Sequence, residues 1–161
     1  MKSGHFPYRV EYILWLDHGF GVKSDDRMTI TVRNMDEVVN VSEKVQDFCI
    51  SRGINRKCSM QVAICLEEMA GNIVSVGFLQ CEGKKNLVVD IYVAVKDDEV
   101  FIRMKDNATE YDSFEKLEMY KEEDDDPIKN FGIRMIAKIA RDMKYQTTLG
   151  MNVLTMTLKS A

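Results

Sequence analysis

The spacing of apolar residues restricts the fold of this chain more than any other feature of the sequence. Two stretches, residues 34–52 and 59–76, carry apolar side chains every three or four positions, which is typical of helices with one buried face. Asn34 or Asp36 can cap the first helix, and Gly53 can end it. Outside these stretches, apolar and polar residues alternate in short runs that are typical of strands.

Five short runs are predicted to be strands. They span residues 28–33, 87–95, 100–104, 143–148 and 153–158. Residues 96–99 have the composition of a hairpin turn, Gly150 separates the last two strands, and a third helix is expected at residues 133–141. Because the strands outnumber the connecting helices and arrive in hairpins, the sequence predicts an α+β fold. We expect a two-layer sandwich of a mixed, mostly antiparallel sheet with helices on one face.

Two parts of the chain do not fit this regular pattern. Residues 1–27 are interpreted as an N-terminal arm, or the remnant of an upstream segment, ahead of a domain at residues 28–161. The arm contains an apolar run at residues 12–16, which we expect to dock on the domain or on a second copy in a homodimer, since apolar surface left in water promotes association. The polar stretch at residues 106–126 is expected to be disordered or a functional lid.

Composition excludes several classes of function. The net charge is -4 and the basic residues form no cluster, so neither nucleic acid nor an anionic membrane surface is an expected partner. No apolar run approaches the roughly 18 residues of a membrane span, and no signal peptide is recognisable at the start. The four cysteines lack CxxC spacing and are expected to be buried free thiols in a reducing cytoplasm: Cys49, Cys58, Cys65 and Cys81.

The residues that can carry chemistry lie in four segments. The chain has no GxxxxGK[ST] motif and no GxGxxG after a strand, which excludes the P-loop and Rossmann classes. Glu68 and Asn72 are four residues apart on one helix and therefore share a face. Asp106 directly follows a strand. Residues 130–133 open a helix, and residues 150–155 lead into the last strand.

These segments resemble, in order and separation, the N box and the three glycine boxes of the GHKL (Bergerat-fold) ATPases. The four segments are similar in sequence to the anti-sigma-factor serine/threonine kinase branch: "EEMAGNIVSVGF", "DNATEYDSFEKL", "NFGIRMIAKIA" and "GMNVLTMTL". The resemblance covers residues 28–159 and implies the histidine-kinase-like ATPase fold, with ATP and Mg²⁺ as cofactors. It also implies two protein partners, a sigma factor and an antagonist protein that is phosphorylated on serine or threonine.

The resemblance also implies a role for each matching residue. Glu68 corresponds to the general base that takes the proton from the attacking hydroxyl, and Asn72 to the Mg²⁺ ligand. Asp106 corresponds to the aspartate that accepts the adenine amino group. The other nucleotide-binding positions implied are Ala108, Asn130, Phe131, Gly132, Ile133 and Thr155. Gly132 at a helix start suits phosphate, because free backbone N–H groups and the helix dipole meet there.

At several positions where the family pattern has glycine, this chain has another residue. Ala108 and Glu110 occupy glycine positions of the first box, and Asn130 stands where the second box begins with glycine. Asparagine is the residue best able to replace glycine in a left-handed conformation. These departures leave an alternative open, a catalytically weak or inactive ATP-gated interaction module of a bacterial signalling system. A sensor histidine kinase is disfavoured, since no phosphoacceptor helix precedes Met28.

Overall fold

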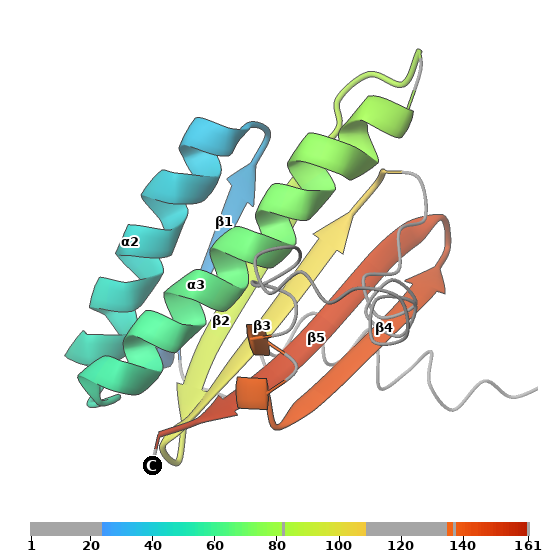
Figure 1. Ribbon diagram of the computed structural model, residues 1–161. Helices are drawn as coiled ribbons and strands as arrows, with labels where there is room; N and C mark the ends of the chain where they lie inside the picture. The colour runs from blue at the N-terminus through green and yellow to red at the C-terminus, as the bar shows by residue number, and fades with distance from the viewer. Residues whose placement is uncertain (1–23, 82, 109–134, 137, 161) are drawn as a thin grey trace, which may run out of the picture.

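The computed structural model describes residues 24–81, 83–108, 135–136 and 138–160 and has two layers (Figure 1). One layer is a five-stranded sheet, and the other consists of the helices α2 and α3, which lie side by side on one face of it. The predicted α+β sandwich is therefore confirmed. Every pairing between the described strands is antiparallel, so this part of the sheet is not mixed.

The strands follow the order β1-β2-β3-β5-β4 across the sheet. Their bounds are β1 Arg27–Val32, β2 Val89–Lys96, β3 Glu99–Asp106, β4 Asp142–Thr148 and β5 Met151–Lys159. Compared with the sequence prediction, β3 runs two residues further, to Asp106, and β5 begins two residues earlier. Both extensions pair with each other, since Asp106 lies opposite Asn152. The last residue of β3 and the second of β5 are thus neighbours.

Two-residue turns join β2 to β3 and β4 to β5. Asp97 and Asp98 have φ values of 51° and 61°, and Leu149 and Gly150 have 54° and 75°. Positive φ at both central residues matches the twist of a hairpin, and aspartate and glycine accept it at low cost. Both predicted turns are confirmed.

Each long helix begins at an asparagine cap. Helix α2, Met35–Ser51, is capped by Asn34, whose side chain accepts from the N–H of Glu37 at 2.9 Å. Helix α3, Arg56–Asn72, is capped by Asn55, so it begins three residues before the predicted start at Ser59. Both caps satisfy N–H groups that have no partner within the helix.

Helix α3 does not continue unchanged to Val76, as its apolar spacing suggested. A π-helical turn, η3 Ile73–Gly77, follows Asn72 directly, and a short 3₁₀ turn, η4 Phe78–Gln80, follows that. Single π turns are rare in proteins overall, but those that occur often lie at functional sites. The change in hydrogen bonding therefore falls next to one of the residues singled out for binding.

The main core lies between the helices and the sheet. It includes Val38, Val45, Val62, Leu66 and Met69 from the helices, and Ile91, Val93, Ile102, Met104, Leu154 and Met156 from the strands. Alternate residues of each strand point to the other face, which we call the outer face. Ile136 is also part of this core. The third helix ends at residue 139, before the predicted end at residue 141, because Arg141 donates its backbone N–H to Thr157 and the chain enters β4 at Asp142.

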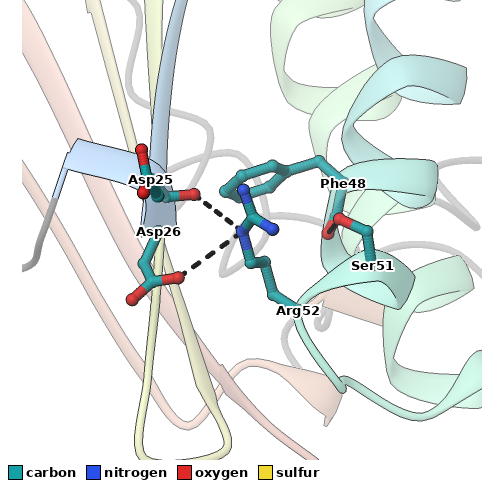
Figure 2. Close-up of polar contacts among 5 residues, drawn as sticks. All are labelled: Asp25, Asp26, Phe48, Ser51 and Arg52. Atoms are coloured by element: carbon teal, nitrogen blue, oxygen red, sulfur yellow. Dashed lines mark hydrogen bonds and ion pairs between the residues drawn. The ribbon is translucent and has the colours of Figure 1, made fainter.

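The described chain begins with a contact that holds its first residues to the end of α2. The short turn η2 Ser24–Asp26 precedes β1, and Arg52 donates from Nε to the carbonyl of Asp25 at 2.7 Å (Figure 2). The same Nε lies 3.4 Å from a carboxylate oxygen of Asp26, and the guanidinium lies over the Phe48 ring. Residues 24–27, assigned to the arm from the sequence, are thus packed on the domain. Residues 1–23 lie outside the described part.

The cysteines are buried and free, as predicted. Burial raises the pKa of Cys49 and of Cys65 to about 12, with a smaller contribution from the neighbouring Cys58. Thiols of this kind are inert at neutral pH. The described residues contain no group of histidine, cysteine, aspartate and glutamate side chains that could hold a metal ion among themselves. They also contain no helix long and apolar enough to cross a membrane.

Candidate functional site

The first part of the site is a buried carboxylate at the end of β3. Asp106 is 4% exposed and points to the helix side of the sheet. Its Oδ1 accepts from the Ala108 N–H and from Asn152 Nδ2, both at 2.9 Å. Asn152 also donates to the Ala108 carbonyl at 3.1 Å. No described residue donates to Oδ2 of Asp106, which leaves one oxygen of a fixed carboxylate available to a ligand donor.

Burial sets the protonation behaviour of this carboxylate. It raises the pKa of Asp106, because the charged form loses hydration. The hydrogen bonds from Asn152 and the Ala108 N–H, and the charge of Lys84, act in the opposite direction but do not cancel the effect of burial. A ligand that donates a hydrogen bond would therefore satisfy a group that the fold leaves incompletely paired.

A second asparagine holds the loop beside this carboxylate. Asn107 accepts from the Val88 N–H through Oδ1 and donates from Nδ2 to the Asn86 carbonyl, both at 2.9 Å. The Lys84 ammonium donates to the Asn107 carbonyl. The loop at residues 83–88 is thereby fixed to the end of β3. Neither Asn107 nor Asn152 was assigned a role from the sequence, although both lie within the segments that were singled out.

The second part of the site is the last turn of α3, where two adjacent glutamates differ in their surroundings. Glu67 accepts a hydrogen bond from the Ser42 hydroxyl at 3.1 Å and so connects α3 to α2. Glu68 is exposed and makes no hydrogen bond or ion pair with a described residue. The fold uses Glu67 and leaves Glu68 available.

Asn72, one turn after Glu68, is also unused by the fold. Its Nδ2 is buried and has no hydrogen-bond partner, whereas Asn34, Asn55, Asn107 and Asn152 all bond within the structure. A buried amide without a partner is costly unless a ligand completes its bonding. A single amide oxygen beside phosphates suits Mg²⁺, which retains several waters. The unpartnered Nδ2 fits a ligand acceptor such as a phosphate oxygen, and the oxygen of the same carboxamide is of the kind that Mg²⁺ takes.

A close contact connects the two parts of the site. A Cβ added at Gly77, in the π turn after Asn72, would lie 3.5 Å from the Cβ of Ala108. The buried Ala108 methyl therefore packs on the backbone of the segment that follows α3. A Cβ at residue 77 would make only an ordinary van der Waals contact with Ala108, so the alanine of the first glycine box fits here without strain.

The structure does not bring Thr155 together with Asp106. Thr155 pairs with Arg103 and Lys144 and points to the outer face, where it lines a hollow together with Phe101 and Thr157. Side chains alternate along a strand, so a residue three positions after Asn152 must face the other way. Asn152, rather than Thr155, lies beside Asp106.

The remaining predicted positions lie outside the described residues. They are Asn130, Phe131, Gly132 and Ile133. The chain on either side of residues 109–134 lies on the helix side of the sheet, since both Ala108 and Ile136 belong to the main core.

The structure combines an antiparallel sheet covered by two helices, a fixed carboxylate at one strand end, and two polar side chains on the facing helix that the described fold leaves unused. This combination is typical of a nucleotide-binding domain of the GHKL class. A family model described as a histidine kinase-like ATPase domain matches residues 29–158, and the chain belongs to this family. The family implies ATP as the ligand. A search of curated proteins found no match.

Proposed function

We propose that this protein binds Mg²⁺-ATP and transfers the γ-phosphoryl group to a serine or threonine of an antagonist protein, as anti-sigma-factor kinases do, and thereby controls a sigma factor. The observation that carries the proposal is the pair Glu68 and Asn72. Both side chains lie on the last turn of α3, and the described fold uses neither. The sequences of the four segments support membership of the anti-sigma-factor kinase branch, and the family match supports an ATP-binding site.

Asp106 is the adenine-recognition residue in this proposal. Its free Oδ2 accepts a hydrogen bond from the exocyclic amino group of adenine, while the bonds from Asn152 and Ala108 to Oδ1 hold the carboxylate in place. Guanine carries a carbonyl at the same position and would face a repulsive acceptor. One oriented oxygen therefore selects the base.

Asn72 would hold Mg²⁺ through its side-chain oxygen. When bound, the ion neutralises charge on the phosphates and orients them. The Nδ2 of Asn72, buried without a partner, would then face the bound nucleotide or its waters. A ligand role would explain why this carboxamide is left unpaired.

Glu68 would act as the general base. Its exposed position lets a hydroxyl of a second protein approach it, which a buried carboxylate could not do. The carboxylate takes the hydroxyl proton as the oxygen attacks the γ-phosphorus, the bond to the β-phosphate oxygen breaks, and ADP leaves. Glu67 instead contacts the Ser42 hydroxyl on α2, a hydroxyl that also donates to the Val39 carbonyl at 2.8 Å.

Calorimetry with ATP in the presence and absence of Mg²⁺ tests the binding step, and transfer of label from γ-labelled ATP to candidate antagonist proteins tests the chemical step. We expect binding that Mg²⁺ strengthens, together with transfer to the cognate antagonist. Absence of binding at protein concentrations high enough to detect a weak site would overturn the proposal. Tight binding without transfer to any antagonist would instead support the ATP-gated interaction module.

A further inference from the structure

The centre of the outer face is buried, although α2 and α3 both cover the opposite face (Figure 1). Ala94 is 0% exposed, Val153 1%, Arg103 6% and Tyr92 8%. Side chains on an uncovered sheet face remain largely in water. These fractions hold for a single copy of the chain, and no described helix or strand lies over this face. The described helices and strands therefore leave part of this burial unaccounted for.

We propose that the apolar run at residues 12–16 accounts for this burial, as an arm docked across the outer face of its own domain. The run has the composition that the surface requires: Tyr12, Ile13, Leu14, Trp15 and Leu16. The docked arm lies on the opposite side of the sheet from Asp106, so this inference is independent of the proposed kinase activity.

The other long segment outside the described residues is a poorer candidate for this position. Ala108 and Ile136, on either side of residues 109–134, are both buried in the core on the helix side. The segment also carries the acidic run at residues 122–126, which would be costly to bury on an apolar surface. The positions of Ala108 and Ile136 and the acidic composition of the segment both favour the N-terminal arm over it.

The arm can reach the outer face from where the described chain begins. The described chain begins at Ser24, three residues before the edge strand β1, and the Arg52 contacts hold the next two residues in place (Figure 2). The eight steps along the chain from Leu16 to Ser24 can span up to about 26 Å when extended. Crossing from β1 to β5 covers three strand intervals, which is about 14 Å.

Charge supports the same placement. The Arg103 guanidinium lies on the outer face, 4.6 Å from the centre of the Tyr92 ring. The apolar run is flanked by two acidic residues, Glu11 and Asp17. An arm crossing this face would bring these carboxylates near the Arg103 guanidinium, which attracts them.

Trp15 is the only tryptophan of the chain and reports on the arm directly. In the full chain we expect Trp15 emission to be blue-shifted relative to the denatured chain and protected from iodide, with light scattering showing a monomer. Ala94→Arg on the outer face and Leu14→Asp on the arm should each shift the emission to that of the denatured chain and remove the protection, with circular dichroism unchanged. Val39→Arg, at an exposed position on α2, is the matched control and should change nothing.

Three results would overturn the inference. Trp15 emission of the unmodified chain could already equal that of the denatured chain. It could remain protected in both folded variants, which would place the arm elsewhere. It could also be protected only in a dimer and lose protection on dilution, which would make a second copy the occupant. If Ala94→Arg fails to fold, Leu14→Asp decides, because residue 14 lies outside the described domain.

Discussion

At the residue scale, the site depends on one oxygen of Asp106. In Asp106→Asn, the amide oxygen can keep the bonds from Asn152 and the Ala108 N–H, while a donor replaces the acceptor that faces the ligand. A hydrogen bond to a charged group contributes about 1.5–3 kcal/mol, so ATP affinity should fall about 10- to 100-fold. The nucleotide preference should move toward GTP, because guanine carries a hydrogen-bond acceptor where adenine carries its amino group. Calorimetry with both nucleotides measures this, and unchanged selectivity would contradict the assignment.

The raised pKa of Asp106 predicts a pH dependence of stability. The folded state binds this proton more tightly than the unfolded state, so the carboxyl stabilises the fold most at pH below its ordinary value of 3.8. That contribution is lost as the pH rises through the folded pKa. Asp106→Asn has no carboxyl group at this position and therefore does not lose this stability. The melting temperature of the variant, relative to that of the unmodified protein, should rise as the pH rises. Thermal melts of both proteins from about pH 4 to 7 test this, and a constant difference would show that the carboxyl does not titrate as expected.

The two glutamates of α3 provide a matched pair for testing catalysis. Glu68→Gln keeps the shape of the side chain but cannot take a proton, so phosphoryl transfer should fall on the order of 10²- to 10⁴-fold with ATP binding retained. Glu67→Gln can still accept from Ser42 and should transfer at close to the normal rate. Equal losses in both variants would indicate that the negative charge of the helix end matters, rather than a base at one position.

At the scale of elements, Asn107 connects the loop at residues 83–88 to the end of β3. Asn107→Ala removes the side-chain bonds to Val88 and Asn86, so hydrogen exchange should accelerate in this loop while the strands stay protected. ATP affinity should fall less than in Asp106→Asn, because the carboxylate itself keeps its partners. Lys85→Ala, at an exposed position of the same loop, is the control. Unchanged exchange in the loop would show that Asn107 does not hold it.

At the scale of the whole molecule, ligand binding should stabilise the fold by mass action. Mg²⁺-ATP at 100 times its Kd should add about 2.7 kcal/mol to the free energy of unfolding. Removing Mg²⁺ with a chelator should reduce this gain, and Asn72→Ala should abolish the Mg²⁺-dependent part of it. Asn40→Ala, at an exposed position of α2, serves as the control. Thermal melts with ATP, with and without Mg²⁺, separate these contributions. A full Mg²⁺ effect in Asn72→Ala would exclude Asn72 as the ligand.

Local patterns were sufficient to predict most of the fold. Both long helices, all five strands and both turns follow from spacing and caps, because periodicity and capping depend on residues only a few positions apart. The π turn after Asn72 was not foreseen, since its apolar spacing is close to that of an ordinary helix. Glu68, Asn72 and Asp106 were predicted as site residues from the order of the motifs.

Only the tertiary structure decided which polar groups share a site. Strand register places Asn152, rather than Thr155, beside Asp106, because pairing between β3 and β5 determines which side chains meet at that strand end. The packing of α3 on α2 commits Glu67 to Ser42 and leaves Glu68 free. Such choices depend on contacts between residues far apart in the chain, which local spacing does not encode.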